Sequence, residues 1–336
     1  MDATTTLPGA YFHELLSLCA RCGVTAGALL EGTGVTLAAL RDPATRLPLP
    51  QCAALVARAR SLSDEPALAF LMGTQMRLSW HGFLGFAAMT ASTVRDALEI
   101  AQSFSLTRTA AFGISSYVEG DVAALVLEER APLGELREFA VITLLVGISQ
   151  IARAMTGEPL TGVAECAFPE PSYAERVLRG QSAQTGGTML FDRPSHRLLF
   201  AATVLDMPVV TADPIATQLA RAECDRELSA LAETVGFVGR VRALVARGDE
   251  GMRASDEVAH RLHVSPRTFK RRLSAHGTSF SALREEVRRQ RALLLLANRQ
   301  LTLSDVAGRL GYSDVANFTR AFRRWTGQTP ARYRAK

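Results

Sequence analysis

The sequence predicts an α+β amino-terminal domain followed by an all-α carboxy-terminal domain. Three observations support this fold class. The chain has 336 residues, which suits two domains of roughly 100–200 residues each. Helix-like and strand-like apolar patterns occupy separate stretches of residues 1–207, as is typical of α+β domains. Residues 233–336 carry helical patterns only, and they contain an internal repeat.

Two local patterns define the middle of the first domain. Thr93, followed three residues later by Asp96, predicts a helix whose first turn is capped by both side chains. The alternating runs 112–118 and 122–127 flank Glu119-Gly120-Asp121 and predict a β-hairpin. Further strands are expected at residues 163–168, 187–191 and 196–200.

A core helix is predicted over residues 135–155, ending at Gly157, a common helix C-cap. Its longest apolar run, Phe139 to Ile148, is too short to span a bilayer. No basic stretch precedes an apolar one at the start of the chain, so no secretory signal is visible. Five cysteines do not make a disulfide framework, and they suggest a reducing compartment. We therefore expect a cytoplasmic protein without a membrane partner.

Charge separates the two domains, which a helical linker over residues 208–232 is expected to join. Residues 233–336 hold 21 Lys and Arg against 9 Asp and Glu, a net of +12. The rest of the chain holds 17 against 24, a net of −7. A basic domain beside an acidic one is typical of proteins that bind a polyanion such as DNA. A basic surface that is merely solvated has the same composition.

Catalytic and metal motifs are weak. Cys19 and Cys22 have redox or metal spacing, but no second Cys/His pair accompanies them, so core packing is favoured. His260, His263 and His276 lie on and between predicted helices, where solvent-facing or DNA-facing roles are favoured over a metal cluster. No nucleophile elbow, phosphate-binding loop or dinucleotide fingerprint is present. We therefore expect no enzyme activity, no cofactor and no metal.

The internal repeat predicts two helix-turn-helix units, at residues 255–277 and 304–325. Each copy begins with a short helix that turns a valine, an alanine and a leucine inward. These residues are Val258, Ala259 and Leu262 in the first copy, and Val306, Ala307 and Leu310 in the second.

A turn and a second helix follow in each copy, over residues 266–275 and 314–324. In the first copy, Ser265 is the expected N-cap and Pro266 occupies the first helical position. In the second copy, Gly311 supplies the turn and Ser313 is the expected cap.

The second helices bury an apolar pair four residues apart, Phe269 with Leu273 and Phe318 with Phe322. Polar residues are left on the opposite faces: Lys270, Arg271, Thr319 and Arg320. In helix-turn-helix proteins the first helix supports the second, and the second presents polar groups to the major groove. A single helix pair is common in helical proteins, but two copies in the basic domain favour DNA binding.

The stretch between the copies reads as one helix over residues 281–298. At 1.5 Å per residue it is roughly 27 Å long. Such a strut can set two recognition helices in successive major grooves, about 34 Å apart on one face of the duplex.

Residues 235–334 resemble the AraC/XylS regulators. The second half of this region carries the family's pattern, Asp305-Val-Ala, Gly311-Tyr-Ser, Phe318-Thr-Arg-Ala-Phe-Arg-Arg, Gly327, Pro330 and Tyr333-Arg334. The resemblance implies a transcription regulator, more often an activator, that binds double-stranded promoter DNA on the nucleoid and has RNA polymerase as a partner.

By position, the resemblance implies that both recognition helices touch base edges. The matching residues are Arg267, Lys270 and Arg271 in the first, and Val315, Ala316, Asn317, Thr319 and Arg320 in the second. Phosphate contacts are expected from Thr268, Arg272, Ser313, Arg323 and Arg324. Because Val315 and Ala316 are apolar, the second helix either reads thymine methyl groups or mostly grips phosphate.

The first domain is similar to one branch of this family, the regulators of the ornithine-utilisation type with an arabinose-binding-type domain. The similarity rests on Trp80-His-Gly-Phe-Leu-Gly85, Ala88, Ser92-Thr-Val94 and Ala97-Leu98. It implies a domain that senses a small-molecule effector and takes part in homodimerisation. The effector and its binding residues stay unassigned. Arg108 and His81 are candidates to meet a carboxylate, and each is equally consistent with a structural role.

Two rival functions follow from the same motifs. A DNA-repair enzyme can carry this DNA-binding unit, but it needs a zinc-cysteine cluster and a reactive Pro-Cys-His-Arg segment. Cys166 lies in Glu-Cys-Ala-Phe and Cys224 in Glu-Cys-Asp-Arg, so that segment is absent. The other rival is an architectural DNA binder without an effector, which a ligand-dependent rise in melting temperature distinguishes.

Overall fold

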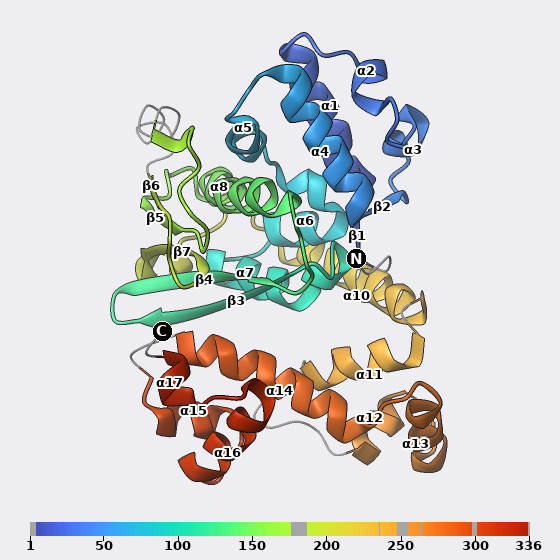
Figure 1. Cartoon of the computed structure of the whole chain (residues 1–336), viewed down its shortest axis with the longest axis vertical. Coiled ribbons are helices and arrows are strands. Elements are labelled where there is room, and N and C mark those ends of the chain that lie inside the picture. Colours follow the sequence, from blue (N-terminus) through green and yellow to red (C-terminus); the bar gives the residue numbers. More distant parts are fainter. Residues whose placement is uncertain are drawn as a thin grey trace. The chain divides into compact units, whose positions relative to one another are not determined.

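The computed structural model describes residues 5–175, 187–234, 236–246, 255–262, 264–297 and 301–334. The chain forms two compact units, Met1–Leu228 and Ser229–Lys336 (Figure 1). The first unit contains helices and a sheet, and the described part of the second is helical, so the predicted fold class is confirmed.

The first unit begins with a small helical layer. Strands β1 (Thr6–Pro8) and β2 (Arg46–Pro48) pair antiparallel beneath it. Its helices are α1 (Gly9–Arg21), α2 (Ala26–Leu30), α3 (Leu37–Arg41), α4 (Leu49–Ser63) and α5 (Leu68–Thr74). The short helices α2 and α3 each start at a threonine, Thr25 and Thr36, whose side chain accepts a backbone N–H of the first turn.

A tight helical corner follows, formed by the short 3-10 helix η1 (Leu78–His81), α6 (Gly82–Met89), α7 (Val94–Phe104) and η2 (Ser105–Thr107). Gly82 has φ +59°, and a Cβ on Gly85 would lie 1.7 Å from the carbonyl oxygen of Leu78. Only glycine fits at both positions, because one backbone is left-handed and the other touches a carbonyl. The predicted capping box of Thr93 and Asp96 at the start of α7 is confirmed.

The main sheet has the strand order β3-β4-β7-β5-β6. Its strands are β3 (Phe112–Glu119), β4 (Val122–Glu129), β5 (Gly162–Glu165), β6 (Gly187–Leu190) and β7 (His196–Ala201). The predicted hairpin is β3 paired antiparallel with β4. The strand expected over residues 163–168 is shorter and ends at Glu165; beyond it the amide of Ala167 donates to the side-chain Nδ1 of His196 (3.0 Å) rather than to a backbone carbonyl.

Helix α8 (Leu136–Thr156) is the central core helix of this unit and ends at Gly157, as predicted. By length and composition it could cross a membrane, but half of that apolar stretch is buried inside the unit. Leu136, Ile142 and Leu145 are almost fully buried in the main apolar cluster. We therefore assign α8 to the core.

The last helix of the first unit is α10 (Pro214–Thr234), which follows the 3-10 helix η3 (Ala202–Asp206). A second apolar cluster anchors α10 through Ala220, Cys224 and Leu228, packed with Ile100 of α7. Helix α10 continues past Leu228, the last residue of the first unit, into the second.

The second unit consists of α11 (Gly236–Ala246), α12 (Ser255–Arg261), α13 (Pro266–Ala275), α14 (Phe280–Ala297), α15 (Leu303–Arg309), α16 (Val315–Thr326) and α17 (Pro330–Arg334). Each helix-turn-helix pair has its own apolar cluster, one around Phe269 and one around Phe318. Helix α14 contributes to both, with Leu283 in the first cluster and Leu296 in the second. The predicted connecting helix is therefore present, and its expected last residue, Asn298, lies outside the described residues.

Candidate nucleic-acid interface

Helix α13 begins as its sequence predicts. The Ser265 side chain accepts the backbone N–H of Thr268 (3.2 Å), and Pro266 takes the first helical position, where a missing N–H costs nothing. Phe269 is fully buried and meets the rings of Phe237 and Phe280 edge-on, at centroid distances of 5.6 and 5.8 Å. This packing fixes which face of α13 points outward.

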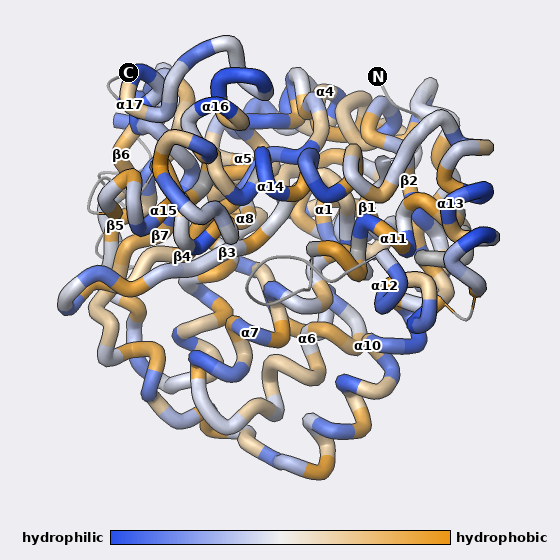
Figure 2. The backbone as a smooth tube through the Cα atoms, turned by 90° about the horizontal axis from the view of Figure 1, so that it is seen from below, coloured by the Kyte–Doolittle hydropathy of each residue, from blue (hydrophilic) through white to orange (hydrophobic). Residues whose placement is uncertain are grey.

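Three basic side chains occupy the outward face of α13. Arg267, Lys270 and Arg271 are exposed, and none has a hydrogen-bond or ion-pair partner among the residues that the structure describes. Arginine in this state can give its planar fork of N–H donors to a guanine edge or a phosphate. In Figure 2 the hydrophilic residues of α13 are coloured blue.

Arg272, an expected phosphate contact, lies on the flank of α13. Its guanidinium carbon is 5.3 Å from the centroid of the Phe237 ring, a cation–π contact within its own unit. Thr268, the other expected phosphate contact of α13, is half-buried, and its hydroxyl accepts a hydrogen bond from Ser265 (3.0 Å). Both side chains thus also serve the packing and capping of the helix.

The start of α16 differs from the sequence expectation. Asp314 caps this helix, its carboxylate accepting the backbone N–H of Asn317 (2.7 Å), so the assignment of Ser313 as the cap was wrong. Aspartate and serine are equally good caps. Here the helix begins at Val315, which places Asp314 at the capping position, and the Ser313 hydroxyl instead donates to the Asp314 carboxylate (3.1 Å). These hydrogen bonds hold the pKa of Asp314 below its ordinary value.

Asn317 is tied into the same network. Its amide nitrogen donates to Asp314 (2.6 Å) and to Ser313 (3.1 Å), and its amide oxygen accepts from Arg320 (2.7 Å). The amide is therefore occupied at both ends. Base reading by Asn317 requires these hydrogen bonds to be exchanged for contacts to a base.

The outward face of α16 carries Ala316, Arg320 and Arg323, all exposed. Val315 is half-buried and packs against the cluster around Phe318. Thr319 is half-buried. Because Arg320 donates to Asn317, this face has fewer basic side chains without a partner than α13 has, within the described residues.

Two arginines near the end of α16 differ in their surroundings. Arg323 has no partner among the described parts of the chain, whereas Arg324 forms an ion pair with Glu285 of α14. Exposed pairs of this kind contribute at most about 1 kcal/mol, so Arg324 can exchange its partner for a phosphate at small cost.

The first unit contains a partly open apolar cavity of about 250 Å³. Tyr11, His81 and Arg108 are among the residues that line it, and the surface that faces the cavity is almost entirely apolar. Sequence reasoning left the effector residues unassigned. The available signal was the segment Trp80–Gly85, four residues of which line this cavity.

The buried cysteines are poorly suited to nucleophilic chemistry. Burial raises the pKa of Cys19 to about 11, of Cys224 to about 11 and of Cys166 to about 12, so each remains a thiol at neutral pH. His263 lies outside the described residues. Within the described ranges, no three His, Cys, Asp or Glu side chains come together as metal ligands.

Family models match both units. Residues 23–209 match the arabinose-binding domain of the AraC transcription regulator, and residues 258–336 match a helix-turn-helix domain. The ornithine utilization regulator of Pseudomonas aeruginosa is 32% identical, over 98% of this chain and 96% of its own length. An uncharacterized HTH-type transcriptional regulator of Mycobacterium tuberculosis is 29% identical, over 93% and 91%.

Solved structures resemble the chain as well. The transcriptional regulator CdpR from Pseudomonas aeruginosa covers 97% of this chain and 98% of its own, with a TM-score of 0.46 and 22% identity. The DNA-binding domain of AdpA, solved with a target DNA, covers 29% of this chain and 89% of its own, with a TM-score of 0.27 and 30% identity.

Proposed function

The chain belongs to the AraC/XylS family of transcription regulators, and we propose that it is an effector-responsive activator that reads promoter DNA with α13 and α16. Its general function, DNA-binding transcription regulation, follows from this membership. The observation that carries the finer proposal is the outward face of α13, where Arg267, Lys270 and Arg271 are exposed and lack partners within the described residues.

In this proposal the two recognition helices have unequal roles. Helix α13 reads bases through Arg267, Lys270 and Arg271, because each can donate to the acceptors of guanine. On α16, Arg320 and Thr319 reach base edges, and Asn317 does so after its own network opens. The apolar Val315 and Ala316 contribute contacts to thymine methyl groups.

Phosphate contacts then set the register on the duplex. The side chains assigned to them are Thr268, Arg272, Ser313, Arg323 and Arg324. Arg323 is the most available of these, because Arg272 stacks on Phe237 and Arg324 is paired with Glu285. Helix α14 has 18 residues, or about 27 Å of axial length, which suits recognition helices in successive major grooves about 34 Å apart.

The first unit senses the effector in this proposal, and its cavity of about 250 Å³ is the binding site. The name of one relative concerns ornithine utilization. L-Ornithine carries two charged ends, whereas the surface of the cavity is almost entirely apolar, so we propose that this chain answers to a less polar molecule.

A second copy of the chain is the proposed partner of an exposed apolar surface on the first unit. Large apolar side chains on α6 and around the start of α10 are 43–73% exposed, and both segments pack on the same buried apolar cluster. The exposed side chains are Phe83, Phe86, Val210, Ile215 and Leu219. Replacing Ile215 and Leu219 by glutamate is expected to convert dimers to monomers in size-exclusion chromatography with light scattering. An unchanged mass would reject this interface.

RNA polymerase is the proposed second partner, and the chain acts on nucleoid DNA in the cytoplasm without catalysing a reaction itself. The test is transcription in vitro with purified bacterial RNA polymerase. A duplex site selected by the protein from a randomised pool is placed upstream of a weak promoter. We expect more transcript from this template than from one with a scrambled site. Less transcript would reject activation in favour of repression.

A further inference from the structure

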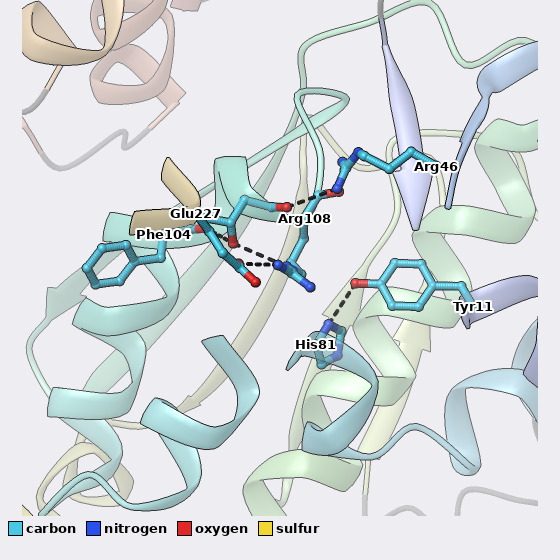
Figure 3. Close-up of polar contacts among 7 residues, drawn as sticks. Tyr11, Arg46, His81, Phe104, Arg108 and Glu227 are labelled. Carbon is cyan, nitrogen blue, oxygen red and sulfur yellow. Dashed lines mark hydrogen bonds and ion pairs between the residues drawn. The ribbon is translucent and has the colours of Figure 1, made fainter. Parts of the chain in front are cut away.

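Arg108 is the one charged residue among the described residues that line the cavity. Its side chain is 15% exposed, and its guanidinium forms an ion pair with Glu227 of α10 (Figure 3). Its Nε donates to the Thr107 hydroxyl (3.1 Å), and Nη1 lies so close to Gly82 that a Cβ there would be 2.8 Å away. The guanidinium is therefore held in one place at the cavity wall.

The surroundings of Arg108 carry more positive than negative charge. Arg46 donates hydrogen bonds to the carbonyl oxygens of Arg108 (2.5 Å) and Thr107 (3.1 Å), and to the Thr6 hydroxyl (2.9 Å). No carboxylate pairs with Arg46 among the residues that the structure describes, and Glu227, which pairs with Arg108, acts on Arg46 only through space. Partly buried cations favour a second anion nearby.

The remaining polar pair near Arg108 is neutral. The Tyr11 hydroxyl and Nδ1 of His81 share a hydrogen bond of 2.8 Å (Figure 3). Burial raises the pKa of Tyr11 to about 12, and burial together with Arg108 lowers the pKa of His81 to about 4. Neither group adds charge at neutral pH. The pair can donate to or accept from an incoming polar group.

The rest of the cavity is apolar. Its walls come from α1, α7, α8 and the sheet, with Phe12, Phe112, Phe139 and Leu198 among the lining residues. Its volume of about 250 Å³ lies near the lower end of the range for small-molecule sites, about 300–1,000 Å³. A ligand that fits therefore has an apolar body of medium length, and among the described lining residues a charged end can meet a countercharge only at Arg108.

Helix α10 connects this site to the DNA-binding unit through the chain itself. Glu227 lies one residue before Leu228, the last residue of the first unit, and α10 continues to Thr234 in the second. The ion pair with Arg108 is thus one of the side-chain ties that hold α10 to the first unit just before the chain leaves it.

We propose that the cavity binds an amphipathic monocarboxylate, whose carboxylate takes Arg108 in competition with Glu227 and so loosens the end of α10. This proposal rests on the sensing role proposed above. A ligand shifts a conformational equilibrium only through its different affinity for the two states. Here the state in which Glu227 has left Arg108 binds the carboxylate more tightly, and by reciprocity the ligand favours that state.

Octanoate is the probe, and the full-length chain is used. Isothermal titration compares octanoate with 1-octanol and octylamine, which keep the apolar body and change the polar end. We expect octanoate to bind at least tenfold more tightly than 1-octanol, and octylamine not to bind. Equal affinities for octanoate and 1-octanol, or no binding of octanoate to the folded protein, would overturn the proposal.

Two variants test the residues. Arg108→Gln is expected to lose octanoate affinity at least tenfold, while Arg95→Gln is the matched control, since Arg95 pairs with Asp206 on the surface of the same unit. Glu227→Gln removes the competitor and keeps Arg108, so it is expected to bind octanoate at least threefold more tightly. If Arg108→Gln does not fold, Glu227→Gln alone tests the proposal. An unchanged octanoate affinity in that variant would show that Glu227 does not compete with the ligand for Arg108.

DNA affinity supplies the regulatory readout. Saturating octanoate is expected to change the affinity of the parent for its selected duplex by the same factor as Glu227→Gln does without ligand, and to change the variant little. Specific DNA binding without octanoate tests the proposed function separately. Intact DNA binding that ignores both octanoate and the variant would overturn the coupling through α10 alone.

Discussion

Replacing Arg271 by alanine tests the reading role of α13. The side chain is exposed and makes no hydrogen bond or ion pair in the described part of the chain, so its loss is expected to change the free energy of unfolding by at most about 0.5 kcal/mol. A bidentate base contact is worth roughly 1–3 kcal/mol. This corresponds to about a 5- to 150-fold loss of affinity for the preferred site.

The assay is fluorescence anisotropy at one fixed salt concentration, with the selected duplex and a scrambled duplex. Because non-specific binding depends mainly on phosphates, affinity for the scrambled duplex is expected to fall much less, so the ratio of the two affinities drops. Arg95→Ala, in the first unit, is the matched control. An unchanged ratio, or an equal loss on both duplexes, would refute base reading by Arg271.

Three further predictions concern α16. Phe318→Ala removes a fully buried ring and is expected to lower the free energy of unfolding of the second unit by about 3–5 kcal/mol, measured by urea denaturation; a loss under 1 kcal/mol would contradict the packing. Because the N–H of Asn317 lowers the pKa of Asp314, the cap stabilises above the ordinary pKa of 3.8 and is lost as the pH falls through the lowered value. Acid titration of the helical circular dichroism is expected to show this component in the parent and not in Asp314→Asn, and identical curves would count against it. Alanine at Arg323 and Arg324 is expected to flatten the plot of log affinity against log salt by about 0.9 for each phosphate that the protein no longer neutralises, whereas a parental slope would show that neither arginine binds phosphate.

The repeat could be predicted from the sequence because its determinants are local. The Phe269–Leu273 and Phe318–Phe322 spacings define the buried faces, and Ser265 with Pro266 defines a helix start. Adjacent Ser313 and Asp314 are both good caps, so the sequence does not choose between them. Only the position of the first helical residue does.

Contacts between residues far apart in the chain could not be predicted from the sequence. Arg108 and Glu227 are 119 positions apart, and Arg46 reaches the carbonyl of Arg108 across 62. The sequence left Arg108 with two possible roles, and the fold places it both in an ion pair and at a cavity wall. Similarly, composition does not reveal that Arg272 stacks on Phe237 or that Arg324 pairs with Glu285. Such arrangements depend on how the helices pack.

The central proposal is that α13 and α16 occupy two major grooves of one site. Methylation interference on the selected duplex measures this directly, because methyl groups on guanine N7 block contacts in the major groove. We expect two clusters of interference on the same face of the duplex, separated by about one helical turn of 10–10.5 base pairs. The cluster that disappears in Arg271→Ala belongs to α13. A single cluster, or two clusters on opposite faces, would contradict the proposal.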